Sequence, residues 1–181
     1  MAPAIRGTPP GVKVKVKVKM ENENEIDELL KIAVEAGLEG LDFLSQFSYA
    51  QLADGYNGIG PEFLPPKLRN KVTDILAIFA PAALIHDMRN EMSDGTRASF
   101  LAANDEFRRN CIKLADFHFG PFRPRRYHAR GIAQVLYDFV SAENFGWRAW
   151  LEAKERHAAK ISSGNSVWGG SKNPVNPVNP V

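Results

Sequence analysis

Residues 80–87 read Ala-Pro-Ala-Ala-Leu-Ile-His-Asp, an apolar and helix-forming run that ends in the ionisable pair His86 and Asp87. An apolar helix is expected to be buried, and burying ionisable groups without partners is costly. The two side chains must therefore be satisfied locally or serve a function. A histidine beside an aspartate is the minimum equipment for a general base next to a metal-binding carboxylate.

A glycine-rich turn precedes this helix in the chain. Residues 56–61 read Tyr-Asn-Gly-Ile-Gly-Pro, and glycine permits the positive φ angles that tight turns require. The turn and the His-Asp pair together give the sharpest functional hypothesis that the sequence supports. The alternative is a plain turn, with the pair capping or bridging helices.

The rest of the central sequence shows the periodicity of amphipathic helices. We predict helices over residues 25–34, 41–52, 67–79, from Pro81 onward, and over 96–117 and 126–161. In the helix over 96–117 we expect the buried residues to be Phe100, Leu101, Phe107, Cys111 and Leu114. The predicted fold class is therefore all-α, a helical bundle whose domain covers residues 21–161.

The two ends of the chain differ from this body. Valine and lysine alternate strictly over residues 12–19, a period of two that predicts a β-strand within an N-terminal arm, residues 1–20. The valines that share its apolar face are Val12, Val14, Val16 and Val18. A lone strand is unstable in water, so we expect it to pair with another chain or to lie on a surface.

The C-terminal residues 162–181 predict an extended tail. Asn-Pro-Val repeats from residue 173 to the end of the sequence, and repeated Asn-Pro excludes helix and favours extended backbone. The two ends together suggest contacts with other protein chains in a large assembly.

Composition excludes several classes of protein. A single cysteine, Cys111, rules out an intrachain disulfide scaffold, and we expect a buried structural thiol there. The net charge of +2 is too small to imply nucleic-acid binding by itself. Residues 1–20 contain no apolar core segment, so we expect no secretory signal, and no apolar run is long enough to span a bilayer.

Three short motifs follow one another in an order that resembles a known family. They are Tyr56-x-Gly58-x-Gly60-Pro61, Ala82-Ala83-x-x-His86-Asp87 and Ala103-Asn104-Asp105-Glu106-Phe107. This pattern is similar to phospholipase A2, and most of all to the disulfide-free phospholipase A2 domain of parvovirus capsid proteins. The resemblance covers residues 55–117. With the unusual ends, it implies a virus- or phage-associated virion protein, located in the virion or the host cytoplasm.

The resemblance assigns chemical roles. His86 would be the general base that takes a proton from water, and Asp87 would bind Ca²⁺ as the cofactor. Oxygen atoms around Asn57, Gly58 and Gly60 would supply further ligands, as a hard cation requires. The metal would polarise a phospholipid ester, and a carboxylate on the neighbouring helix would hold the histidine in the right tautomer.

The sequence departs from the family pattern at three places. The orienting aspartate aligns with Asn104, and Asp105 lies one residue, or about 100° of helix rotation, out of register. The tyrosine of the family's His-Asp-x-x-Tyr motif is Asn90, and the turn reads Gly-Ile-Gly-Pro-Glu. Two hypotheses therefore stay open. One is a calcium-dependent phospholipase A2-type hydrolase, and the other is a purely structural subunit of a virion or other assembly with an inactive phospholipase-like fold.

One cluster combines basic and aromatic residues. Its arginines are Arg123, Arg125, Arg126 and Arg130, interleaved with Phe119, Phe122 and Tyr127. It suits anionic lipid headgroups or, more weakly, nucleic-acid phosphates. The competing interpretation is a solvated loop and helix start.

Overall fold

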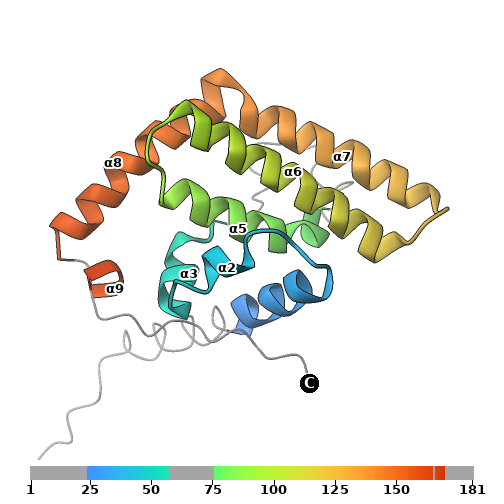
Figure 1. The fold of residues 1–181 in the computed structure, drawn as a ribbon, viewed down its shortest axis with the longest axis horizontal. Helices are drawn as coiled ribbons and strands as arrows, with labels where there is room; N and C mark the ends of the chain where they lie inside the picture. The colour runs from blue at the N-terminus through green and yellow to red at the C-terminus, as the bar shows by residue number, and fades with distance from the viewer. Residues whose placement is uncertain (1–23, 58–75, 165, 170–181) are drawn as a thin grey trace, which may run out of the picture.

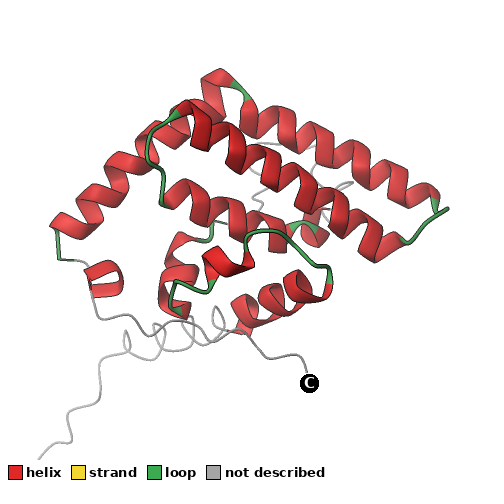
Figure 2. Cartoon of the chain, viewed as in Figure 1, coloured by secondary structure: helices red, strands yellow, loops and turns green. Residues whose placement is uncertain are grey.

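The computed structural model describes residues 24–57, 76–164 and 166–169, which form packed helices (Figure 1). These described residues contain helices and connections but no β-strand (Figure 2). The predicted all-α fold is therefore confirmed. The predicted strand with Val12, Val14, Val16 and Val18 lies outside the described residues, as do the Asn-Pro-Val repeats.

Local sequence signals mark the starts of two of the helices in the structure, α5 and α6. Residues 24–35 and 76–78 are helical. The other elements are α2 (Leu41–Leu44), α3 (Tyr49–Gly55), α5 (Ala80–Glu91), α6 (Arg97–Phe119), α7 (Pro124–Ser141), the π-helix η2 (Glu143–Trp147), α8 (Arg148–Ser162) and α9 (Ser166–Gly169). Pro81 lies in the first turn of α5, where its missing N–H costs nothing. Thr96 caps α6 by accepting from the backbone N–H of Ser99.

Helices α6 and α7 form a long antiparallel pair, α5 packs against α6, and α8 returns to contact α5 (Figure 1). Buried apolar side chains fill the space between them, among them Leu84, Ile85, Met88, Phe107, Cys111, Leu114, Ala133 and Leu136. Burial raises the pKa of the Cys111 thiol, consistent with a structural role. The prediction for Leu101 is wrong, because it is 43% exposed and lies about 100° around α6 from the buried Phe100.

Three predicted segments need correction. The single helix expected over 41–52 is two, α2 and α3, because Ser48 starts a new helix with a capping box. The side-chain oxygen of Gln51 accepts from the Ser48 backbone N–H at 2.8 Å. The helix expected over 126–161 breaks at the extended Ala142 and continues through η2 into α8.

The third correction concerns the start of the predicted extended tail. Helix α8 runs to Ser162, and residues 166–169 form α9. The Trp168 indole explains this turn of helix, because its Nε1 donates to Asp54 Oδ2 at 2.8 Å. The same ring packs edge-on against Phe47 and His157.

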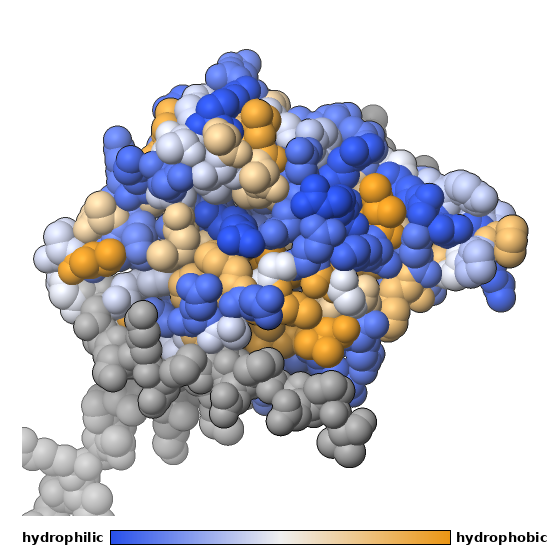
Figure 3. Space-filling view, in the orientation of Figure 1, coloured by the Kyte–Doolittle hydropathy of each residue, from blue (hydrophilic) through white to orange (hydrophobic). Residues whose placement is uncertain are grey.

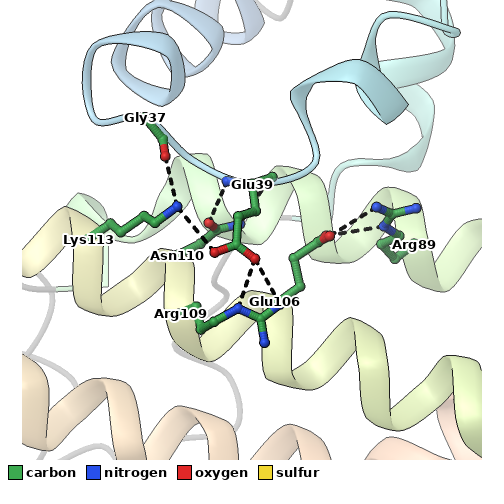
Figure 4. A network of polar contacts seen from close by, with 7 residues as sticks. All are labelled: Gly37, Glu39, Arg89, Glu106, Arg109, Asn110 and Lys113. Carbon is green, nitrogen blue, oxygen red and sulfur yellow. Dashed lines mark hydrogen bonds and ion pairs between the residues drawn. The ribbon is translucent and has the colours of Figure 1, made fainter.

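A polar network holds the segment before α2 against α6 (Figure 4). Asn110 Oδ1 accepts from the Glu39 backbone N–H at 2.8 Å, and Asn110 Nδ2 donates to the Glu39 carbonyl at 3.0 Å. Arg109 and Lys113 form ion pairs with the Glu39 carboxylate. The backbone N–H and carbonyl of Glu39, in the connection before α2, are thus both satisfied by one α6 side chain.

Within the described part of the chain, none of the helices combines the length and the apolar character that crossing a membrane requires.

Candidate active site

Helix α5 presents His86 and Asp87 in two directions, because consecutive helical residues differ by about 100°. His86 faces α6, where its Nε2 lies 2.9 Å from Asn104 Oδ1. Asp87 faces the end of α3, where its Oδ2 accepts from the backbone N–H of Asn57 at 2.9 Å. One helix therefore links the buried α6 residue Asn104 to Asn57, the second residue of the glycine turn.

The surroundings of Asn104 determine the tautomer of His86. Asn104 Nδ2 lies 3.4 Å from the carbonyl oxygen of Val140, which can only accept a hydrogen bond. The Asn104 amide oxygen must then point at His86, and His86 Nε2 must carry the proton and donate it. His86 Nδ1 keeps its lone pair, and it has no hydrogen-bond partner among the described residues.

Burial lowers the pKa of His86, against smaller raising effects from its hydrogen bond to Asn104 and from the Glu106 charge. The ring is densely surrounded by protein, with Phe107 at a centroid distance of 4.8 Å, yet the residue keeps intermediate exposure to solvent. A neutral amide cannot stabilise the imidazolium form as a carboxylate would. His86 is therefore a neutral imidazole at pH 7, the form that accepts a proton.

Asp105 lies on the exposed side of α6, where its Oδ1 accepts from the hydroxyl of Tyr137 at 3.0 Å. Of the two α6 candidates, only Asn104 contacts His86. Consecutive residues of a helix differ by about 100° in direction, so Asp105 points away from His86 when Asn104 points toward it.

The calcium hypothesis depends on Asp87 and the glycine turn. Asn57 is described and adjoins Asp87, whereas Gly58 and Gly60 lie outside the described residues. Burial, followed by the charges of Glu25 and Asp87, raises the pKa of Tyr56 to about 12. Among the described residues no cluster of three or more His, Cys, Asp or Glu could hold a metal. Asp87 and the turn offer oxygen donors, the class that Ca²⁺ prefers.

His86, Asp87, Asn90 and Asn104 are the polar residues that α5 and α6 contribute to the lining of a cavity of about 650 Å³. Its other walls are largely apolar and come from α6, α7, η2 and α8, including Phe100, Leu136, Phe139, Val140, Phe145 and Trp150. This volume lies in the range of small-molecule sites. The sequence did not predict these walls. They depend on the break after α7, which places η2 residues in the lining, and no strong local signal marks that break.

The arginine cluster divides into two pairs. Arg126 and Arg130 both bind the carboxylate of Asp116 and hold its pKa below the ordinary range, with the Arg126 hydrogen bond the largest cause. Arg123 and Arg125 are exposed and border a separate cavity of about 620 Å³ beside His118.

No protein-family model matches the chain, and neither a curated protein nor a solved structure matches it at a significant level.

Proposed function

We propose that this chain is a phospholipase A2-like domain of a virus- or phage-associated virion protein, and that it hydrolyses phospholipid esters with Ca²⁺. One observation carries the proposal. The His86 imidazole donates from Nε2 to the fixed Asn104 amide and keeps Nδ1 unprotonated, on the wall of a largely apolar cavity.

In this proposal His86 Nδ1 accepts a proton from a water molecule as the water oxygen bonds to the ester carbonyl carbon. The bond from that carbon to the alcohol oxygen then breaks, and the proton passes from His86 to the leaving oxygen. The products are a fatty acid and a lysophospholipid. Asn104 positions the ring throughout, and the apolar walls accommodate an acyl chain.

Asp87 and oxygen atoms of residues 57, 58 and 60 would hold the Ca²⁺. When bound, the ion supplies positive charge to the ester oxygens. The backbone N–H of Asn57 already fixes the Asp87 carboxylate at the start of this turn.

Replacing an orienting aspartate by asparagine removes a charge that would stabilise the protonated histidine. We therefore expect slower turnover than a carboxylate in that position would give. The same reasoning makes Asn104 the most informative position for substitution.

The test is calcium-dependent release of fatty acid from phospholipid vesicles. His86→Gln should lower the rate at least about 100-fold, the usual contribution of a general base. Asp87→Asn should remove the calcium dependence. Asp105→Asn is the matched control, because Asp105 is exposed and bonded to Tyr137, and its rate should stay within about twofold of the parent. Equal release from the parent and His86→Gln, or none from either, would remove the catalytic claim.

The neutral Asn104 opposite His86 also favours a second candidate, a structural subunit of a virion or other assembly with an inactive site. Deleting residues 1–20 and 172–181 should then abolish assembly while the helical body stays folded. Normal assembly of the truncated chain would count against this candidate.

A further inference from the structure

The connection between α6 and α7 places a large apolar side chain in water. Phe122 is 90% exposed, the most exposed of the large hydrophobic residues in the described part of the chain. It is also the only non-glycine residue there with positive φ, at 75°. A side chain with a Cβ clashes in this left-handed conformation. Exposure and strain at one residue are both unfavourable, so folding alone does not explain the choice of phenylalanine.

Aromatic residues gather around this position. Phe117 in the last turn of α6 is 46% exposed, and Tyr127 in the first turn of α7 is 64% exposed. In the view of Figure 3, hydrophobic side chains lie beside hydrophilic ones at the right-hand end of the molecule, where α6 joins α7. Aromatic rings beside polar groups are typical of residues that lie at a membrane interface.

Two arginines at this end are available to bind a partner. Arg126 and Arg130 are bound to Asp116, but Arg123 and Arg125 are exposed and have no ion pair among the described residues. They line the cavity of about 620 Å³ together with His118, Phe119 and Pro124. A guanidinium pair beside a cavity suits phosphate groups.

We propose that this end of the molecule, defined by Phe117, Phe122, Arg123, Arg125 and Tyr127, docks on an anionic lipid bilayer. Phe122 enters the boundary between headgroups and acyl chains, and the two arginines contact lipid phosphates. A nucleic acid is the weaker match, because protein surfaces that bind it are strongly positive and polar. Here two available arginines accompany three exposed aromatic rings.

The docking surface is separate from the cavity at His86. Helix α6 contributes Phe107 to that cavity and reaches Phe119 before the connection, a rise of about 18 Å along one continuous helix. Membrane binding can therefore be measured without catalysis, and the inference does not rest on the proposed hydrolysis.

The experiment uses the full chain carrying His86→Gln, so that hydrolysis cannot alter the lipid. Sedimentation with vesicles measures binding, using phosphatidylcholine alone or an equal mixture with phosphatidylglycerol. We expect binding to the mixture only. Phe122→Ala should weaken it about tenfold, and Arg123→Gln and Arg125→Gln should weaken it about fivefold each.

Phe122→Gly separates docking from a structural role. Glycine adopts the positive φ without a clash, so the melting temperature should equal or exceed that of the parent while vesicle binding weakens about tenfold, as in Phe122→Ala. Val135→Ala is the matched control, since Val135 is 60% exposed in the middle of α7 and its loss should leave binding unchanged.

Three results would overturn the proposal. The first is no binding to the mixed vesicles. The second is binding that Phe122→Ala and Phe122→Gly leave within twofold of the parent. The third is binding to single-stranded DNA that both arginine substitutions abolish, without vesicle binding, which would assign the surface to nucleic acid.

Discussion

Asn104 and Asn110 are both buried on α6, with 1% and 0% of their surface exposed, yet their amides have different partners. Asn110 uses both amide atoms on the backbone of Glu39, at 2.8 and 3.0 Å. Asn104 faces the titratable His86 at 2.9 Å and reaches the Val140 carbonyl at only 3.4 Å. A buried asparagine that saturates backbone groups serves the fold, whereas one that orients an imidazole beside a cavity is placed for the chemistry that we propose.

The largest expected effect is on stability at Asn110. Asn110→Ala leaves the N–H and carbonyl of Glu39 without partners, and it should lower the free energy of unfolding by about 2–4 kcal/mol. Asn104→Ala removes one good and one long hydrogen bond and should cost about half as much. Urea denaturation measures both values. Equal losses would erase the distinction between the two residues.

The next effect concerns rate. Asn104→Asp gives His86 a charged partner, worth about 1.5–3 kcal/mol in the transition state, so fatty-acid release should rise about 10- to 100-fold. Asn110→Asp is the matched substitution and should bring no increase, because it faces Glu39. An unchanged rate in Asn104→Asp would show that the positioning of His86 is not limiting.

Of the two asparagine sites, only that of Asn104 should contribute to the pH dependence of stability between pH 7.5 and 5. Burial lowers the pKa of His86 below its ordinary 6.5. Protonation then favours the unfolded chain, so this contribution is complete above pH 6.5 and is lost as pH falls toward the native pKa. Chemical denaturation between pH 7.5 and 5 should give a flatter stability profile for His86→Gln.

The control for this titration is Asn110→Ala, which should keep the slope of the parent. His118, whose pKa burial also lowers, remains in both variants and supplies a common background. If the free energy of unfolding of His86→Gln still depends steeply on pH, groups other than His86 cause the dependence.

The smallest effect concerns the ion pairs around Asn110. The pairs of Glu39 with Arg109 and Lys113 are solvent-accessible, so Glu39→Gln should cost less than about 1 kcal/mol and nothing at 1 M salt. A loss as large as that of Asn110→Ala would mean that charge, rather than the amide, holds this connection.

Much of the central architecture follows from local signals. Pro81 and Thr96 mark the starts of α5 and α6, and helical register alone distinguishes Asn104 from Asp105. The cavity could not be predicted in this way, because its walls depend on the break at Ala142. Gly146 approaches the Val140 backbone so closely there that a side chain has no space. Glycine meets close contacts in many different structures, so its presence at residue 146 does not by itself predict this break.

The sequence did not predict the long-range polar contacts either. The Asn110 to Glu39 clamp joins residues 71 positions apart, and no periodicity selects that pair. The positive φ of Phe122 could not be predicted either, because glycine is the residue that usually adopts this conformation.

The single thiol of Cys111 lies fully buried in the middle of α6, and its raised pKa keeps it protonated. Only the thiolate reacts with alkylating reagents, so the native protein is inert to them until α6 separates from its neighbours. The chain therefore contains its own reporter of transient opening. The rate of thiol modification, followed by mass spectrometry, would count those openings without an introduced label.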